Sequence, residues 1–501
     1  MEKKVRVRFA PSPTGGLHLG GVRTALFNYL FAKQNNGTFI LRVEDTDQTR
    51  FVPGAEEYIA SCLEWCGMTP DESPNVGGPF APYRQSERKA SYRQYAEQLV
   101  MSGHAYYAFD TPEELDVKRK AAPNFLYGQA TRMEMRNSLT LGREEVQQLL
   151  DENTAHVIRI KIPENETVTF FDQIRGHVSF DTNLVDDKVL LKADGMPTYH
   201  LAVVADDRAM EISHVFRGEE WLPSAPIHIL LWRYLGWEDE MPAWVHLPLI
   251  LKPDGNGKLS KRDGDRLGFP VYAQNWTDPK TGDLTKGFRE LGFMPEAFIN
   301  LLAMLGWNDG TDQEIFNMEQ LIEKFSLDRI SKAGAKFDYE KAKWYNHEWI
   351  KQSDAAALAP EVKALLADAG VAVQDDENLL TVIELIKDRC TLISDFVTQS
   401  SYFFVSPKEY DVAAVKPKWN SQKTAFFEAY ATGPMEGTAV ELEAEFKALA
   451  AEHQLKPGEL MLPFRVMLVG GKFGPGVFDI AILLGKAEVE NRIRQALKAF
   501  I

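Results

Sequence analysis

Apolar and charged residues alternate near the start of the chain in a pattern that predicts a β–α–β unit. Residues 5–9 (VRVRF) alternate as a strand does when one of its faces is buried. Residues 22–34 carry apolar side chains at helical spacing and end at Asn-Asn-Gly, a stop signal for a helix. Residues 38–44 (TFILRVE) then predict a second strand. Because strands joined by a helix run parallel, this order predicts an α/β fold built on a parallel sheet.

The remaining pattern predicts an insertion, a return of the sheet and a helical C-terminal part. Residues 85–194 mix helices with the short strands HVIRIKI, HVSF and KVLLK, which indicates an insertion. The strand pattern resumes at YHLAVVADD and HVFRGEEW, and a helix follows at PIHILLWRYLGW. Residues 249–268 are polar and rich in glycine and aspartate, which is typical of a pliable loop. From about residue 337 onward the apolar residues fall almost entirely at helical spacing.

Length, charge and cysteine content narrow the class of protein. At 501 residues the chain is too long for one core and suggests about three domains. A net charge of −16 argues against a generic nucleic-acid-binding protein, although a local basic stripe can still bind nucleic acid. The three cysteines complete no metal motif and indicate free thiols in a reducing compartment. With no apolar leader and no membrane-length run, we expect a soluble, cytoplasmic protein.

The stretch RFAPSPTGGLHLGG, residues 8–21, lies between a predicted strand and a helix N-terminus. Glycines there let the backbone approach a ligand, and free N–H groups with the helix dipole favour an anion. The stretch is not a P-loop, which needs Lys in place of Gly21, nor GxGxxG, because Leu17 replaces a glycine. Taken alone, His18 is either a packed histidine in a tight turn or a donor beside a phosphate.

A second polar stretch, KLSKR at residues 258–262, places three cations within five residues: Lys258, Lys261 and Arg262. A solvated basic loop is the simpler interpretation. The alternative is a cationic loop that closes over a polyphosphate and stabilises charge developing on a leaving pyrophosphate. The flanking PDGNG and DGDRLG make such a closure feasible.

Together, PSPTGGLHLGG and KLSKR resemble the HIGH and KMSKS signatures of class I aminoacyl-tRNA synthetases. RFAPSPTG, LRVEDTD, PTYHLAVVADD, FRGEEW and KLSKR in this order resemble glutamyl-tRNA synthetases of the bacterial type. FDYEKAKWYN and GPGVFDIAILLGK in the helical part are similar to that family too, so the resemblance covers nearly the whole chain.

The resemblance implies a glutamate–tRNA ligase. Such an enzyme uses ATP with Mg²⁺ to activate L-glutamate as glutamyl-adenylate, and transfers it to the 3′-terminal adenosine of tRNA(Glu). Activation is expected to require bound tRNA, and the enzyme is expected to be a monomer. The sequence does not say whether tRNA(Gln) is also charged.

The resemblance also implies a Rossmann-like parallel-sheet catalytic domain with an inserted α+β domain, followed by an all-helical anticodon-binding region. The expected divisions are 1–84 and 195–250 for the two halves of the catalytic domain, 85–194 for the acceptor-stem-binding insertion, 251–336 for a stem-contact domain carrying KLSKR, and 337–400 and 401–501 for two helical anticodon-binding subdomains.

The nucleotide site implied by the resemblance centres on the two signature stretches. His18 would contact ATP phosphates and Lys261 would stabilise the transition state on the pyrophosphate side. The residues assigned to catalysis are His18, Lys258 and Lys261, and those assigned to ATP binding are His18, Gly20, Gly21, Glu220, Trp221 and Lys261.

A glutamate pocket must offer two cations and one anion, because glutamate carries two carboxylates and an ammonium. Arg8 and Arg217 can each hold a carboxylate with a planar fork, and Glu44 can pair with the ammonium. Ser12 and Tyr199 can add hydrogen bonds. All but Ser12 are expected near the C-terminal ends of strands, where open α/β sheets bind ligands. By resemblance we assign the side-chain carboxylate to Arg8 with Tyr199.

The helical region is expected to read the tRNA anticodon with cations and stacking aromatic rings. Packing within helices is the competing interpretation for each tryptophan. The candidates are Arg389, Lys416, Lys418, Lys423, Trp344, Trp349 and Trp419.

Four alternative functions fit the sequence less well than a glutamate–tRNA ligase. Glutaminyl-tRNA synthetases carry PPEPNG rather than APSPTG and a β-barrel anticodon region. Glutamyl-queuosine tRNA synthetases lack an anticodon domain, and a small-molecule nucleotidyltransferase would not need some 250 residues beyond its catalytic sheet. A catalytically dead tRNA-binding scaffold would tolerate loss of His18, Lys261 or the pocket arginines, and all of these are present.

The chain departs from the family at two places. Some members carry Asn where this chain has Val203, so a polar contact to the substrate is expected to be absent or supplied elsewhere. Many relatives hold a cysteine-rich zinc knuckle in the insertion, whereas the matching stretch here, HAYYAFDTPEEL, has no cysteine.

We therefore predict that the protein holds no structural zinc, because the thiolate ligands of the knuckle are missing. Elemental analysis of the purified, tag-free protein should find zinc well below one equivalent per chain. A stoichiometric zinc that survives dialysis would contradict the prediction.

Overall fold

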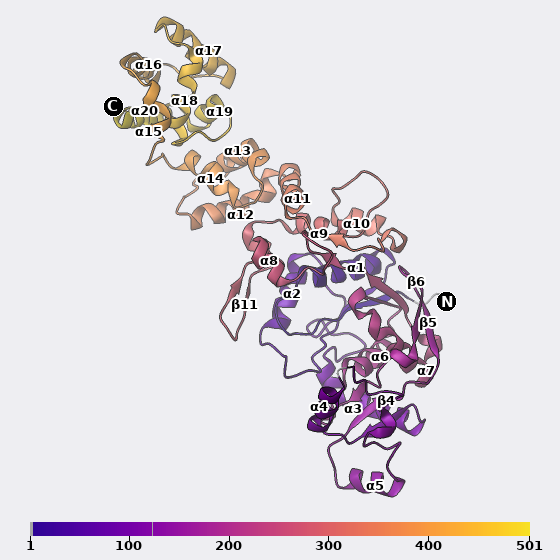
Figure 1. Ribbon diagram of the computed structural model, residues 1–501. Coiled ribbons are helices and arrows are strands. Elements are labelled where there is room, and N and C mark those ends of the chain that lie inside the picture. Colours follow the sequence, from indigo (N-terminus) through magenta and orange to yellow (C-terminus); the bar gives the residue numbers. More distant parts are fainter. Residues whose placement is uncertain (1–3, 123, 501) are drawn as a thin grey trace. The chain divides into compact units, whose positions relative to one another are not determined.

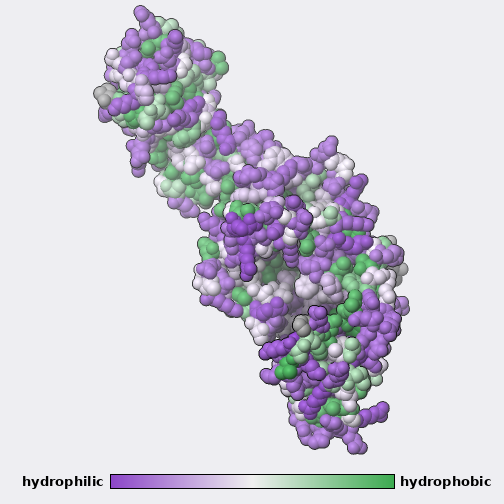
Figure 2. Space-filling model, in the orientation of Figure 1, coloured by the Kyte–Doolittle hydropathy of each residue, from purple (hydrophilic) through white to green (hydrophobic). Residues whose placement is uncertain are grey.

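The computed structural model describes residues 4–122 and 124–500, and the chain divides into two compact units (Figure 1). The first unit comprises residues 1–290 and 298–339, and the second comprises 291–297 and 340–501. The visible surface of both units is mostly hydrophilic (Figure 2), and the large apolar side chains gather in separate cores. Each unit therefore has a hydrophobic core of its own. No helix within the described residues is both long and apolar enough to cross a membrane.

The N-terminal β–α–β prediction is confirmed. Strands β1 (Arg6–Phe9) and β2 (Thr38–Leu41) pair in parallel and are joined by helix α1 (Leu19–Gln34). The helix begins three residues earlier than the sequence pattern predicted, because His18 caps its N-terminus by accepting the Gly20 N–H. The unit thus places the glycine-rich stretch between the end of β1 and the start of α1.

A second sheet continues this arrangement in the order β6-β5-β9-β8. The backbone carbonyl of Arg6 accepts the N–H of Ser213 at 2.9 Å, which ties β1 to the start of β8. Strand β5 is antiparallel to β6 and parallel to β9, and β9 is parallel to β8. The strands are β5 (Thr167–Asp172), β6 (Gly176–Asp181), β8 (His214–Gly218) and β9 (Ala243–Leu247).

Segment 85–194 is not confined to a separate body. Its β5–β6 hairpin pairs with β9 through Asp172 and Trp244, so part of the segment extends the sheet that contains β8 and β9. The rest forms an antiparallel sheet in the order β3-β4-β7 with helices around it, and the strands predicted at HVIRIKI, HVSF and KVLLK are confirmed. These elements are β3 (Ala105–Ala108), β4 (Val157–Ile160), β7 (Val189–Leu191), α3 (Lys89–Met101), α4 (Pro112–Ala121) and α5 (Arg143–Asp151).

The strand predicted at YHLAVVADD is wrong, because these residues form helix α6 (Tyr199–Ala209). Seven consecutive residues of this helix, 201–207, are buried. A helix buried on all sides has no polar face, so its pattern cannot be told from that of a buried strand. Tyr199 therefore starts a helix rather than ending a strand, and Val203 packs into the apolar core.

The loop predicted at 249–268 is also wrong in part. Strand β10 (Ile250–Leu251) turns back so that Leu259 N–H donates to the Ile250 carbonyl at 2.8 Å, and Leu259 is buried. Helix α8 (Lys261–Leu267) follows, with Ser260 Oγ and N–H both donating to the Asp263 carboxylate. A buried leucine and a helix cap explain the order, since they fix a stretch whose composition alone favours a loop.

The described residues of the second unit form helices and no strands, as predicted, and strands β11 (Trp276–Thr277), β12 (Leu284–Thr285) and β13 (Ala335–Lys336) belong to the first unit. Helices α2 (Ala55–Trp65), α7 (Ala225–Tyr234), α9 (Pro295–Met304) and α10 (Met318–Lys324) complete the larger elements before residue 339. The C-terminal helices are α11 (Tyr339–Gln352), α12 (Ala355–Asp368), α13 (Asp376–Ile386), α14 (Asp395–Phe404), α15 (Val412–Val415), α16 (Ser421–Thr432), α17 (Ala439–Glu452), α18 (Pro457–Val469), α19 (Val477–Leu484) and α20 (Lys486–Phe500).

One buried carboxylate fastens segment 85–194 to α6. Asp206 accepts hydrogen bonds from Gln85 Nε2, Arg88 Nε and Tyr92 Oη at 2.7–2.8 Å. All three donors lie at or just before the start of α3 or within it. The carboxylate thus fixes the start of the segment against α6.

Replacing Asp206 by Ala should lower the free energy of unfolding of the first unit by about 3 kcal/mol, because it leaves the Arg88 guanidinium, only 13 % exposed, without its counter-charge and two further donors without their acceptor. Urea unfolding followed by near-UV circular dichroism measures the change. The control is Asp116→Ala, which removes an exposed ion pair with Arg119 and should change stability by less than about 1 kcal/mol. Equal effects of the two substitutions would contradict the assignment.

Candidate active site

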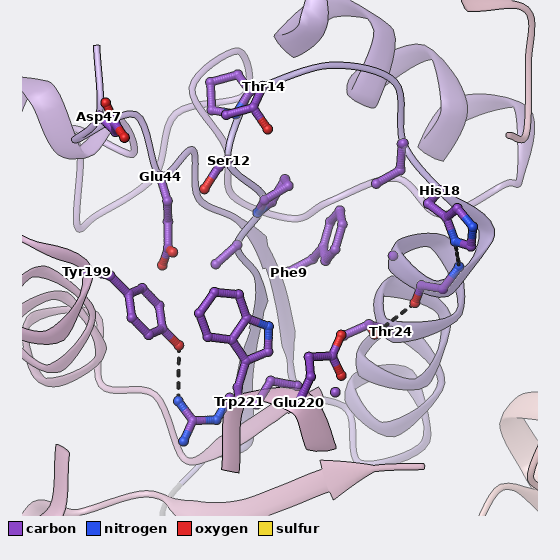
Figure 3. A pocket seen from close by; sticks show the side chains of 18 of the residues that line it. Phe9, Ser12, Thr14, His18, Thr24, Glu44, Asp47, Tyr199, Glu220 and Trp221 are labelled. Carbon is purple, nitrogen blue, oxygen red and sulfur yellow. Dashed lines mark hydrogen bonds between the residues drawn. The ribbon is translucent and has the colours of Figure 1, made fainter. Parts of the chain in front are cut away.

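One pocket of about 1240 Å³ in the first unit collects nearly all of the predicted site residues. It is bounded by the end of β1, the N-terminus of α1, the start of α6, the end of β8 and the β10–α8 connection. Figure 3 shows Ser12, Glu44, Tyr199 and Trp221 turned toward the same space. The predicted residues that line it are Arg8, Ser12, His18, Gly20, Gly21, Glu44, Tyr199, Arg217, Glu220, Trp221 and Lys258. Lys261 is not among the lining residues; it is the first residue of α8, next to Ser260, which does line the pocket.

His18 is held as a neutral ring with one donor left over. Its Nδ1 accepts the Gly20 N–H at 3.2 Å, so the ring proton lies on Nε2. Burial lowers the pKa of His18 to about 4, helped by the nearby charge of Lys258. Nε2 is buried and has no hydrogen-bond partner within the described residues. A buried donor that lines a pocket and lacks a partner fits an anionic oxygen of a ligand.

The glycines of this stretch serve two different purposes. A Cβ at Gly16 would lie 2.9 Å from Trp276 Cγ, and one at Gly21 would lie 2.7 Å from Leu17 Cδ1. These two glycines are needed for packing inside the protein. Gly20 has room for a side chain, since its nearest neighbour would be His18 Nδ1 at 3.6 Å, and it lines the pocket. Close approach of a ligand to the backbone is therefore an argument for Gly20 alone.

Glu219 and Glu220, the two acids of FRGEEW, form ion pairs with the turn of the β5–β6 hairpin and with the KLSKR segment. Glu220 Oε1 contacts Lys258 Nζ at 2.5 Å across the pocket. Glu219 accepts the Leu249 N–H at 3.0 Å and pairs with Arg175. Trp221 is 44 % exposed and lies 4.8 Å from the Tyr199 ring, which leaves one aromatic face open to the pocket. The end of the pocket near His18 thus offers a lysine, the unpartnered Nε2–H of His18 and an aromatic surface.

Arg8 and Glu44 belong to a chain of buried ion pairs. The Asp207 carboxylate accepts from Arg8 Nε at 2.9 Å and from Arg42 Nη1 at 2.8 Å, and Arg42 also donates to Glu44 at 3.1 Å. Burial favours protonation of Asp207, but Arg8 and Arg42 outweigh it and lower its pKa. Burial raises the pKa of Glu44 in spite of Arg42 and Arg8. Arg8 therefore enters the pocket with its charge already matched by a carboxylate.

Arg217 is the opposite case. Its Nε donates to His246 Nε2 at 2.9 Å, and its Nη1 donates to Tyr199 Oη and His228 Nδ1 at 3.0 Å each. Nη2 is buried without a partner, and across the described residues no carboxylate forms an ion pair with this guanidinium. Tyr199 thus bonds to Arg217, although the family resemblance favoured a pairing of Tyr199 with Arg8. A buried cation with free N–H groups is suited to binding a carboxylate.

Sequence reasoning missed Arg42, Asp207, His228 and His246. Arg42 and Asp207 stand in the quoted motifs LRVEDTD and PTYHLAVVADD, and acids at the end of an apolar run signal a buried ion pair. His228 lies in a helix and His246 in a strand with no polar neighbours in sequence, so no pattern marked them. Only the packing of α7 and β9 beside β8 places both rings on Arg217.

Of the residues expected to read the anticodon, some pack into the core of the second unit and others are exposed. Lys423 is buried and its Nζ donates to the Lys418 carbonyl at 2.7 Å, and Trp419 packs on Phe427 and Phe500. Arg389, Lys416 and Lys418 are exposed, Trp349 is half-buried, and Trp344 is 37 % exposed with Lys341 Nζ 3.9 Å from its ring centre. Exposed cations are available to a polyanion, whereas Lys423 and Trp419 take part in the core.

No group of three or more His, Cys, Asp or Glu residues in the part of the chain that the structure describes is arranged to hold a metal ion. Cys62, Cys66 and Cys390 are free and buried. The expectation about zinc stays a prediction.

Comparisons with known proteins agree over the whole chain. Residues 4–344 match the family model for the catalytic domain of class I tRNA synthetases (E and Q), and residues 345–497 match an anticodon-binding domain. The chain is 52 % identical to the glutamate–tRNA ligases of Porphyromonas gingivalis and Bacteroides fragilis, with 99 % of both chains covered in each case. A crystal structure of a glutamate tRNA ligase from Elizabethkingia meningosepticum, in complex with its amino acid, superposes with a TM-score of 0.94 at 49 % identity, covering 99 % of this chain and all of that one.

The low pKa of His18 predicts a pH dependence of stability. Because the pKa is about 4 in the folded state and about 6.5 when unfolded, the unfolded chain takes up the proton first. Stability from this group is complete above pH 6.5 and falls with pH toward 4, by about 2 kcal/mol between pH 7 and pH 5. Urea unfolding of wild type and His18→Asn at both pH values should show the smaller loss in the variant. Equal losses would contradict a neutral, buried ring.

Proposed function

The chain belongs to the glutamate–tRNA ligases, a family of class I tRNA synthetases, and from this premise we propose the roles of its site residues in activating glutamate with ATP and transferring it to tRNA(Glu). The observation that carries the assignment of the amino-acid site is the unmatched charge of Arg217. A buried guanidinium without an acidic partner costs free energy unless a ligand supplies the anion. Glutamate supplies one.

Arg217 and Tyr199 bind the side-chain carboxylate in this proposal. The α-carboxylate loses its charge when it becomes the adenylate, whereas the side-chain carboxylate keeps its charge through both steps. Because no acid among the residues that the structure describes pairs with Arg217, this arginine gains most from a ligand group that stays charged. Arg8, whose charge Asp207 already balances, faces the α-carboxylate end, and Glu44 with Ser12 receives the ammonium. This exchanges the two arginines relative to the assignment made by resemblance.

The other end of the pocket binds ATP. The Nε2–H of His18 donates to a phosphate oxygen, and Gly20 lets a phosphate lie close to the backbone at the N-terminus of α1, where the helix dipole favours anions. Lys258, released from Glu220, and Lys261 at the start of α8 approach the pyrophosphate side. Trp221 offers its face to the base. Phosphate oxygens would supply most of the ligands of the Mg²⁺ ion, and Glu220, a carboxylate near His18, could supply one more. The ion would neutralise part of the phosphate charge.

The chemistry follows from this placement in two steps. An oxygen of the glutamate α-carboxylate attacks the α-phosphorus of ATP, and the bond to pyrophosphate breaks as the adenylate forms. A ribose hydroxyl of the terminal adenosine of tRNA then attacks the activated carbonyl, and AMP leaves. The protein positions the reactants and stabilises charge on the phosphates, and it forms no covalent intermediate. By family resemblance the first step requires bound tRNA.

The remaining expectations form part of the proposal. Residues 85–194 bind the acceptor stem, 251–336 contact the stem, and 337–400 with 401–501 read the anticodon, while 1–84 and 195–250 carry catalysis. The exposed cations Arg389, Lys416 and Lys418 are candidates for contacts with tRNA. Because its tRNA and ATP substrates are cytoplasmic, we place the enzyme in the cytoplasm, and its monomeric state stays a prediction.

Aminoacylation of purified tRNA(Glu) and tRNA(Gln) with labelled glutamate tests the function. Wild type should charge tRNA(Glu), and Arg217→Gln should raise the KM for glutamate by about 100-fold, because it removes a charge-paired hydrogen bond. The KM for ATP should stay unchanged. Arg233→Gln, which removes an exposed ion pair on α7, is the control and should behave as wild type.

A wild-type enzyme that charges neither tRNA with glutamate would overturn the function. Charging with an unchanged KM in Arg217→Gln would leave the function in place and remove Arg217 from the amino-acid site.

A further inference from the structure

The groups that hold Arg217 are all neutral, and this bears on how the site distinguishes a carboxylate from an amide. The inference deepens the proposed function, since it rests on Arg217 binding the side-chain carboxylate of glutamate. The cradle, as we call it, consists of His228, His246, Tyr199 and Trp244. The first three accept hydrogen bonds from the guanidinium, whose carbon lies 5.2 Å from the centre of the Trp244 ring.

The hydrogen-bond partners on the far side of each ring set the tautomers of both histidines. Asp172 Oδ2 lies 2.6 Å from His246 Nδ1, which places the ring proton on Nδ1 and leaves the Nε2 lone pair for Arg217. His228 accepts from Arg217 at Nδ1, so its proton lies on Nε2 and is donated to His200 Nδ1 at 3.2 Å. Each ring therefore presents a lone pair to the guanidinium, and an arginine fork can be held in one orientation.

Asp172 is itself fixed from all sides. It is fully buried at the end of β5 and accepts the N–H groups of Ile174 and Arg175 through Oδ1 and the N–H of His246 through Oδ2. The β5–β6 hairpin of segment 85–194 thus reaches the amino-acid pocket through His246. This carboxylate is separated from Arg217 by the whole imidazole ring.

Burial and the charge of Arg217 keep the rings neutral. Burial lowers the pKa of His246 although Asp172 opposes the shift, and burial with the Arg217 charge lowers the pKa of His228 well below its usual value. The pKa of His200 falls to about 4 for the same reasons, with Lys188 contributing. Two further charged groups that line the pocket, Arg8 and Glu44, already pair with Asp207 and Arg42.

We propose that His228 and His246, with Asp172 behind His246, are positioning residues that orient Arg217 through neutral acceptors and so leave its charge available for the substrate carboxylate. A carboxylate in either position would make the same hydrogen bond but would neutralise Arg217. The pocket would then lose its preference for an anionic side chain over the amide of glutamine. Because the acceptors that orient Arg217 are neutral, they also preserve the preference of the pocket for glutamate over glutamine.

Position 228 allows a matched test of charge against shape. Asn and Asp have the same shape, and the oxygen of either can take the place of His228 Nδ1. His228→Asn keeps a neutral acceptor and should raise the KM for glutamate by no more than about fivefold, from loss of the bond to His200. His228→Asp should raise it by about a further 100-fold, because it places a negative charge beside the bound carboxylate.

The readouts separate this role from simple structural damage. The KM for glutamate is measured in tRNA(Glu) aminoacylation together with the KM for ATP, which should stay constant in both variants. Inhibition by glutamine should strengthen relative to glutamate binding in His228→Asp only. His104→Asn and His104→Asp form the control pair, because His104 stacks on Tyr234 away from Arg217 and neither change should alter the KM for glutamate.

Equal losses in His228→Asn and His228→Asp, or no loss in either, would overturn the inference while wild-type glutamylation leaves the ligase function standing. Absence of wild-type glutamylation would overturn both. Should His228→Asp fail to fold, long-range ¹H–¹⁵N spectra of histidine-labelled wild type decide the matter. The inference requires neutral rings at pH 7, with the proton on Nδ1 of His246 and on Nε2 of His228, and a cationic ring or the opposite tautomer at either position would refute it.

Discussion

The carboxylate of Asp207, held between the guanidinium groups of Arg8 and Arg42, joins the parts of the structure that build the site. Arg8 lies on β1, Arg42 follows β2, and Asp207 lies near the end of α6, so three elements distant in sequence meet at one buried carboxylate. Removing one partner from such a set leaves an unmatched charge in the interior, which is why each member fixes the others. Asp206, the preceding residue of α6, accepts hydrogen bonds from Gln85 and Arg88 and so holds the start of segment 85–194. Two adjacent acids thus set the positions of the sheet, the pocket wall and the insertion.

The two pocket arginines show how environment divides the work of identical side chains. Arg8 is balanced within the protein, whereas Arg217 lies among imidazole, phenol and indole rings. The first stabilises the fold and faces the ligand with little net charge. Arg217 lowers the stability of the ligand-free protein, because its buried charge is unmatched, and it is most stable with an anion bound. Recognition of the ligand therefore comes at the expense of some folding stability. Glutamate binding should therefore also stabilise the first unit by mass action.

The sequence was a good guide wherever its pattern had a polar face or a fixed spacing. The alternation at residues 5–9, the helix stop at Asn35 and the C-terminal helices could all be predicted. It failed at α6, whose residues 201–207 are all buried, and at 249–268, where Leu259 and a helix cap order a stretch that looks like a loop. Its candidates lined one pocket because most lie in or next to the ends of strands and helices that meet there. Charge and ring type marked Lys423 and Trp419 as candidates, whereas Lys423 is buried and Trp419 is partly buried against the core, through packing that no local pattern records.

By itself the sequence determined most of the order of the elements, the family and most members of the pocket, because these depend on residue type and spacing along the chain. Tertiary structure alone decided which cation is matched and which is not. That difference arises from Asp207, His228 and His246, which reach the arginines from α6, α7 and β9. It also decided that His18 is neutral with a free donor, since burial and the Gly20 N–H fix its protonation. The charge state of a buried group depends on its neighbours in space, and sequence spacing does not contain them.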